Sequence, residues 1–164
     1  MAVLSACGQG TAKEALTLTP DSLERRQLQT RIFETDNEAE LLSASAALLQ
    51  DLGFNLDESE VKLGVLVGSK ERDATDYGQE VMAFIGLLFT GVLMPTEDEQ
   101  KIRASIVTRP LEERKGFAVR LTMQRIVWND QRVITRSEAL DDPKFYQDFF
   151  AKLSKAVFLE AQEL

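Results

Sequence analysis

The sequence predicts an α+β protein in which helices pack on one face of an antiparallel sheet. Several consecutive segments have an apolar residue at every second position, which is typical of strands. Two other segments have apolar residues at helical spacing. The 164 residues, 44% of them hydrophobic, are enough for one ordinary domain with a core. The predicted order is β-α-β-β-(α)-β-β-β-α, which folds as two layers.

The first strand and helix are predicted from alternation followed by a capping signal. Apolar and polar residues alternate over 28–33, as in a strand. Thr35 and Glu38 match a capping box, and the apolar residues from Leu41 to Leu52 then follow helical spacing. Gly53 predicts the end of this helix, because glycine adopts the left-handed conformation of a Schellman motif.

A hairpin is predicted next, over residues 54–67. Its two strands carry Phe54 and Leu56, then alternating apolar residues from Val61 to Val67, and Gly64 marks a bend or bulge. An acidic stretch lies on or near the turn and consists of Asp57, Glu58 and Glu60.

Three more strands and a long helix are predicted after residue 100. Residues 101–109 and 116–128 alternate, and the shift of apolar parity late in the second strand predicts a β-bulge near Gln124 and Arg125. A turn at 129–130 leads into a strand over 132–136. Asp141 or Asp142 caps the last helix, and Pro143 fits its first turn. Its predicted buried stripe is Tyr146, Phe149, Phe150, Leu153, Ala156 and Val157.

Residues 81–94 form an almost wholly apolar segment, VMAFIGLLFTGVLM. As a helix it would span about 21 Å, which is shorter than the roughly 30 Å hydrocarbon core of a bilayer, so it is not predicted to cross a membrane. Three alternatives remain: a helix buried under the sheet, a partner-contact surface, or insertion at a membrane interface. The residues predicted to make the partner contact are Phe84, Ile85, Leu88, Phe89 and Leu93.

Charge and composition exclude several function classes. The net charge of −8 disfavours nucleic acid as a partner, because phosphates need a basic footprint. Histidine is absent, so the usual general base and the commonest metal ligand are missing, and neither catalysis, a metal nor a cofactor is expected. Ser59 and Lys62 fit S-x-x-K, but the companion motifs of penicillin-binding enzymes do not follow.

The charge is unevenly distributed along the chain. Residues 32–80 hold three basic and twelve acidic residues, for a net −9, whereas 101–136 hold nine basic and three acidic residues, for a net +6. Several arginines of the basic half should share one face of the sheet, which is either a binding surface for an anionic envelope ligand or acidic protein, or a solvated face. These arginines are Arg103, Arg109, Arg120, Arg125, Arg132 and Arg136.

The amino terminus contains Leu4-Ser5-Ala6-Cys7 followed by Gly8. This run resembles the lipobox of bacterial outer-membrane lipoproteins, and the resemblance implies acylation of Cys7 and a periplasmic domain anchored to the outer membrane. Because Cys7 is the only cysteine, an internal disulfide is excluded. Only six residues precede Cys7, fewer than a signal peptide needs. The implied organisation is a signal-peptide remnant and lipobox at 1–7, a flexible tether at 8–27 and the domain at 28–164.

The run LLQDLGFNLDESEVKLGVLVGSK at 48–70 is similar to the helix-strand-strand unit of envelope lipoproteins. With the last helix it resembles helix-grip domains such as that of the C lipoprotein of the barrel-assembly machinery. The resemblance implies a non-enzymatic accessory or assembly factor that binds an envelope protein. The alternative is a module that binds lipid A or a glycan through the arginines.

Overall fold

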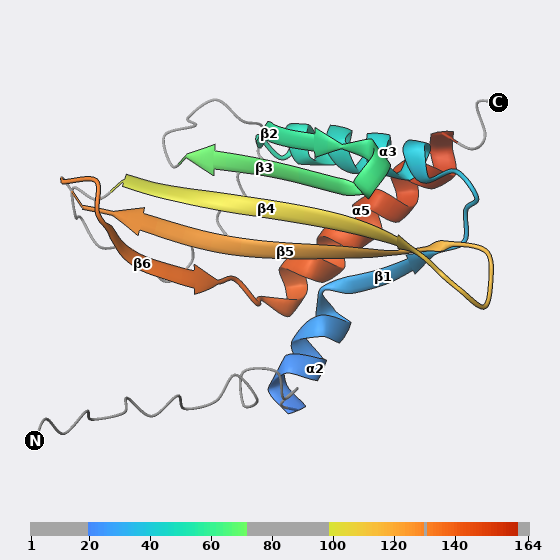
Figure 1. The fold of residues 1–164 in the computed structure, drawn as a ribbon, viewed down its shortest axis with the longest axis horizontal. Coiled ribbons are helices and arrows are strands. Elements are labelled where there is room, and N and C mark those ends of the chain that lie inside the picture. The colour runs from blue at the N-terminus through green and yellow to red at the C-terminus, as the bar shows by residue number, and fades with distance from the viewer. Residues whose placement is uncertain (1–19, 72–98, 130, 161–164) are drawn as a thin grey trace, which may run out of the picture.

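The computed structural model describes residues 20–71, 99–129 and 131–160, and these contain six strands and three α-helices (Figure 1). In chain order the elements are α2 (Pro20–Leu28), β1 (Thr30–Phe33), α3 (Glu38–Asp51), β2 (Asn55–Glu60), the 3-10 turn η1 (Val61–Leu63), β3 (Val65–Glu71), β4 (Glu99–Pro110), β5 (Phe117–Trp128), β6 (Ile134–Ala139) and α5 (Pro143–Glu160). The predicted α+β class is confirmed, and so is the order of the described strands and helices after α2, which was not predicted.

All strand pairs in the sheet are antiparallel, and β5 pairs with three other strands, β1, β4 and β6. The order is β1-β5-β4-β3-β2, and β6 also pairs with β5. β4 pairs with β5 along its whole length, while β1 and β6 share the other edge of β5, at 117–120 and 124–128 respectively. Sequence patterns cannot predict this shared edge, because both strands satisfy the same alternation.

Helices α3 and α5 cover one face of the sheet, and Figure 1 looks onto the other face, with both helices behind the strands. We call these the covered face and the open face. The core lies between the covered face and the two helices, and its fully buried members include Leu41, Leu49, Ile106, Leu121, Phe145, Tyr146, Phe149 and Leu153. The predicted stripe of α5 is confirmed with one addition, Phe145, and with Ala156 and Val157 only partly buried.

The ends of α3 are set by local hydrogen bonds. The cap is Asn37 rather than the predicted Thr35: the Asn37 side chain accepts from the Glu40 N–H at 3.1 Å. At the other end the Gly53 N–H donates to Gln50 and the Phe54 N–H to Leu49, with φ of 80° at Gly53. The predicted Schellman end is therefore confirmed.

Residues 20–27 correct the predicted tether, because they belong to α2. Asp21 in its first turn and Arg25 and Arg26 in its last turn complement the helix dipole. Arg25 also forms an ion pair with Asp141 at 2.8 Å. The folded part of the chain therefore includes Pro20, and residues 8–19 of the predicted tether lie outside the described residues.

The predicted β-bulge near Gln124 and Arg125 was also wrong. The register of β5 with β4 is continuous from Pro110 to Glu99, so the apolar parity shift does not interrupt that pairing. Instead, Arg125 occupies a position on the covered face. A register shift does occur in β5, between Val127 and Trp128, but it affects the pairing with β6.

The turns use the residues that their conformations require. Gly64 has φ of 64°, and a Cβ there would collide with the Thr108 hydroxyl, so the predicted bend is confirmed. The Asn129 side chain accepts from the N–H groups of Gln131 and Val133 in the β5–β6 turn. Asp142, one of the two predicted caps, accepts from the N–H groups at the start of α5.

Candidate functional site: the open face and the β5–β6 hairpin

Several of the six predicted arginines were expected to share one face, and three of them do, while the other three lie elsewhere. On the open face the strand register places Arg103 opposite Gln124, Arg109 opposite Ala118, and Arg120 opposite Val107. Arg125 lies on the covered face. The remaining two, Arg132 and Arg136, belong to the exposed β5–β6 hairpin.

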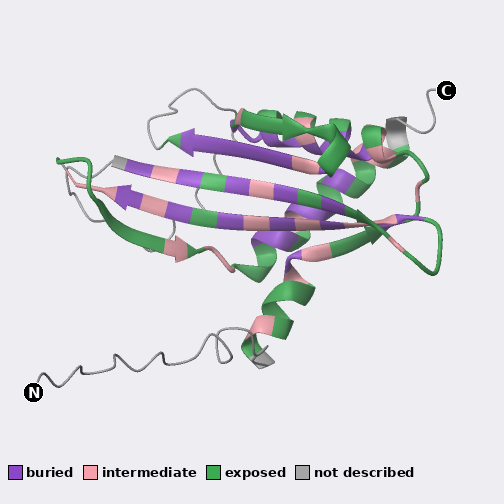
Figure 2. Cartoon of the chain, viewed as in Figure 1, coloured by how far each residue is buried: buried purple, intermediate pink, exposed green. Residues whose placement is uncertain are grey.

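The open face is the larger candidate surface. No helix of the described ranges lies in front of the sheet in the view of Figures 1 and 2. Val107 is 42% exposed and Ile32 is 47% exposed on this face. Arg103 and Arg109 are exposed, and neither forms an ion pair within the described part of the chain. This face therefore combines free cationic groups with exposed apolar groups.

Arg120 differs from these two because its guanidinium is engaged in the structure. Its Nη2 donates to Gln29 Oε1 at 3.1 Å, and its Nε is buried without a hydrogen-bond partner. Gln29 in turn donates to Asp141 at 3.4 Å. Arg120 therefore joins β5 to the α2–β1 junction and to the loop before α5.

Tyr146 lies at the inner end of this network. Its hydroxyl donates to the Leu140 carbonyl at 2.8 Å. Burial, reinforced by the negative charge of Asp141, raises the pKa of Tyr146 to about 12. The phenol is thus neutral at physiological pH and acts as a hydrogen-bond donor in the core.

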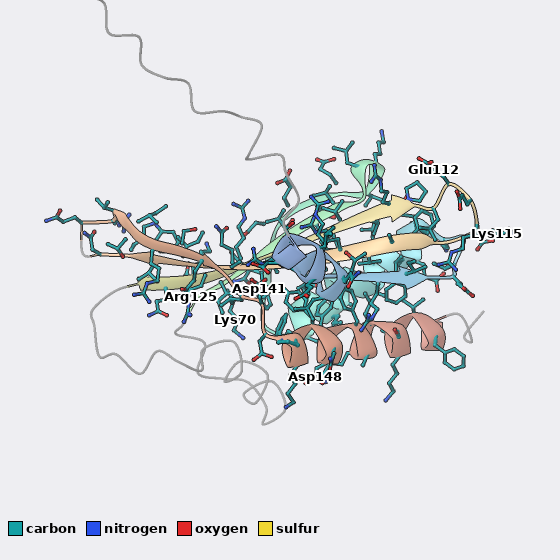
Figure 3. The ribbon with its side chains drawn as sticks, turned by 90° about the horizontal axis from the view of Figure 1, so that it is seen from below. Lys70, Glu112, Lys115, Arg125, Asp141 and Asp148 are labelled. Carbon is teal, nitrogen blue, oxygen red and sulfur yellow. The ribbon has the colours of Figure 1, made fainter. Side chains whose placement is uncertain are left out.

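A row of polar side chains crosses the covered face near the start of α5, and sequence reasoning missed it. Lys70 pairs with Ile102, Ile102 with Arg125, and Arg125 with Glu138. Lys70 and Arg125 are 2% and 9% exposed, and Figure 3 shows both on the side of the sheet that faces α5. The parity that Arg125 shares with Val119, Leu121 and Met123 was the available signal.

Some groups in and beside this row have no hydrogen-bond partner, although Lys70 is not one of them. Lys70 Nζ donates to the Leu52 carbonyl at 2.9 Å, and burial lowers the pKa of this lysine. Glu138 Oε1 lies 2.5 Å from Arg125 Nη2 and forms an ion pair with it, but it accepts no hydrogen bond. Arg125 Nε and Nη1 and Gln100 Oε1 are buried without a hydrogen-bond partner.

Within the described ranges, the acidic stretch of β2 lies away from the hairpin arginines, and only Glu71 and Glu34 of the acidic half form ion pairs with the basic half, with Lys101 and Arg114. Asp57, Glu58 and Glu60 lie on β2, at the opposite edge of the sheet from β6, and are exposed. Asp57 accepts from the Ser69 hydroxyl at 2.9 Å. Ser59 lies on β2 and Lys62 in η1, so S-x-x-K does not begin a helix as it does in penicillin-binding enzymes.

Other predictions fall outside the described residues. These are the lipidation site Cys7 and the apolar contact residues Phe84, Ile85, Leu88, Phe89 and Leu93. Within the described ranges, no helix is both long enough and apolar enough to span a bilayer. The same ranges contain no group of three or more acidic or cysteine side chains placed to bind a metal ion. Neither a family model nor a curated protein sequence matches this chain.

Proposed function

We propose that this chain is a lipid-anchored protein of the outer membrane whose periplasmic domain binds another envelope protein and catalyses no reaction. The observation that carries the proposal is the open face, where exposed Arg103 and Arg109 lie on the same strand as exposed Val107. Surfaces that mix arginine with exposed apolar side chains are typical of protein-binding sites.

The spacing of the arginines favours an acidic protein surface over a single phosphate or carboxylate. Arg103 and Arg109 are six residues apart on β4, which corresponds to about 20 Å along a strand. One small anion cannot contact both groups. A protein surface of ordinary interface size can span that distance and present several carboxylates.

Anchoring is supported by the amino-terminal sequence. Leu4-Ser5-Ala6-Cys7 precedes Gly8, and Cys7 is the only cysteine in the chain. Each buried methylene of an acyl chain contributes about 0.8 kcal/mol, so two or three chains on one cysteine hold a protein at a bilayer. The absence of histidine from the sequence supports binding rather than catalysis.

The anchoring is tested in intact cells of the native host, with the full-length gene product and an alkyne analogue of palmitate. We expect labelling of the wild-type protein and none of Cys7→Ser. An unlabelled wild-type protein contradicts the anchoring.

The binding function is tested by retention of envelope proteins from a solubilised envelope on the acylated protein. We expect Arg103→Glu/Arg109→Glu to lose the retained protein. Lys144→Glu/Lys152→Glu is the control, because it makes the same charge change at exposed positions of α5. Equal retention by both variants contradicts the role of the open face. If vesicles containing lipid A bind instead, and only the open-face variant fails to bind them, the ligand is an anionic glycolipid.

A further inference from the structure

The β5–β6 hairpin is a second exposed surface, separate from Arg103 and Arg109. We call residues 128–129 and 131–137 the hairpin arm. In Figure 1 the arm lies at the end of the sheet away from the body of α5. All seven residues from 131 to 137 are exposed, and Val133 and Ile134 are each 56% exposed. Ile134 begins the edge strand β6 and Val133 lies in the turn before it, so two large apolar side chains are exposed next to an unpaired strand edge, which is where another chain can bind.

β6 offers free backbone groups along its outer edge. Within the described ranges it pairs only with β5. The Leu140 N–H donates to the Met123 carbonyl at 3.0 Å, so the residues two and four positions before Leu140 also bond toward β5. By alternation, Ser137 and Ala139 direct their N–H and C=O groups away from the sheet. An extended segment can add to this edge.

The charge of the arm specifies the partner. Residues 131–137 contain Arg132 and Arg136 and no carboxylate, and neither arginine forms an ion pair within the described part of the chain. Of the carboxylates beside them, Asp130 lies outside the described residues and Glu138 is paired with Arg125. Antiparallel pairing of β6 with β6 of a second copy would set like charges opposite each other if centred on Arg136 or on Glu138. Centred on Ser137, it would set Arg136 against a Glu138 that already serves as the counterion of Arg125. Pairing of β6 with the acidic β2 of another copy would be head to tail, which leads to rings or open filaments. An acidic segment of a different protein has neither problem.

We infer that the outer edge of β6 binds an extended, acidic segment of another protein by strand addition, with Arg132 and Arg136 selecting its carboxylates. In this mode the backbone hydrogen bonds provide affinity, and the side chains provide specificity. The inference concerns a different surface from the one in the proposed function and requires no lipid.

Trp128, the only tryptophan in the chain, provides the readout. It is half-buried on the arm, and its Cα partner is Ile134. The whole chain carrying Cys7→Ser is titrated with an acetylated and amidated octapeptide that alternates glutamate with valine and threonine. The control peptide has the same sequence but is N-methylated at alternate residues, which removes the N–H donors on one edge. We expect a saturable change in Trp128 fluorescence with the first peptide only.

Three variants assign the site of binding. Arg132→Glu/Arg136→Glu should weaken binding at least tenfold, and its exposed positions should leave the thermal midpoint nearly unchanged. Ser137→Pro removes an outward N–H and should weaken binding similarly; circular dichroism checks its fold. Arg103→Glu/Arg109→Glu should change the affinity less than twofold.

The inference is overturned if the octapeptide fails to bind, or if the N-methylated peptide binds equally well. It is also overturned if binding is lost with Arg103→Glu/Arg109→Glu but retained with Arg132→Glu/Arg136→Glu. A dimer in sedimentation that Ser137→Pro dissociates would show that the edge of β6 binds a second copy instead.

Discussion

Arg125 and Glu138 face each other across β5 and β6 on the covered face, with Nη2 of the arginine 2.5 Å from Oε1 of the glutamate. The arginine side chain is 10% exposed and the glutamate side chain 37%. The pair therefore lies at the border of the core, where the positive charge is buried and its counterion reaches solvent. This arrangement lets a charged residue occupy an inward position in an otherwise apolar stretch of β5.

Removing only one member of this pair should destabilise the fold. We expect Glu138→Leu to lower the free energy of unfolding by about 1–3 kcal/mol, because it leaves a buried guanidinium without a counterion. The double variant Arg125→Met/Glu138→Leu should recover most of that loss, since no buried guanidinium then lacks its counterion. Urea denaturation of the wild type, both single variants and the double variant provides the measurement. A double variant whose loss equals the sum of the single losses would show that the two side chains are not coupled.

The arginines of the open face should separate into structural and free groups. Arg120→Ala is expected to lower the free energy of unfolding by about 1–2 kcal/mol, because Gln29 loses a charged hydrogen-bond donor. The free energy of unfolding of Arg103→Ala should stay within about 0.5 kcal/mol of that of the wild type, since the substitution removes no ion pair within the described ranges. Chemical denaturation measures both. Equal losses would mean that the contact between Arg120 and Gln29 contributes nothing.

The amino-terminal cap of α3 can be assigned by comparing two short polar residues. Asn37→Ala should destabilise the protein by about 0.5–2 kcal/mol, because the Glu40 N–H loses its acceptor. Thr35→Ala should cost less, since the Thr35 hydroxyl accepts only from the exposed N–H of Asn37. Thermal unfolding monitored by circular dichroism ranks the two variants. The reverse ranking would restore Thr35 as the cap.

Tyr146 should make the protein sensitive to alkali. Its pKa is raised to about 12 in the fold, above the ordinary value of 10.0, so the unfolded chain loses this proton first as the pH rises. The stabilisation is therefore complete below pH 10 and is lost between about pH 10 and pH 12.

Tyr146→Phe provides the comparison for this prediction. Its free energy of unfolding should fall less steeply than that of the wild type over the same pH range. In the ultraviolet absorbance of the folded protein, the tyrosinate step near pH 12 should disappear with the substitution. A step near pH 10 assigned to Tyr146 would show that the phenol is not held in its neutral form.

Most of the fold could be predicted from local patterns, and the errors occurred where local signals competed. Thr35 and Asn37 are both suitable caps, and the sequence does not show that the first turn begins at Glu38. The stretch from Gly8 to Thr19 is followed by a helix that is largely exposed, so α2 lacks the apolar stripe that would have revealed it. The parity shift after Met123 indicated a bulge, but it reflects a charged residue on the covered face.

The candidate surfaces were only partly predictable. Alternation correctly predicts that Arg103 and Arg109 lie on one side of their strand, because a strand has a period of two. It cannot show whether that side faces solvent or helices, or that Gln29 holds Arg120. The presence of a hairpin here could be predicted from the turn at Asn129, but the exposure of the hairpin arm depends on where α5 packs.

The sequence by itself determined the order of strands and helices after α2, the glycine turns at Gly53 and Gly64, and the apolar stripe of α5. These features depend on backbone conformation and on spacing within a few residues, so each is encoded where it occurs. Only the tertiary structure decided that β1 and β6 share one edge of β5 and that Arg125 lies inside while Arg103 lies outside. Those outcomes depend on partners distant in the chain: Glu138 on β6 offsets the buried charge of Arg125, and the packing of α3 and α5 determines which face is covered.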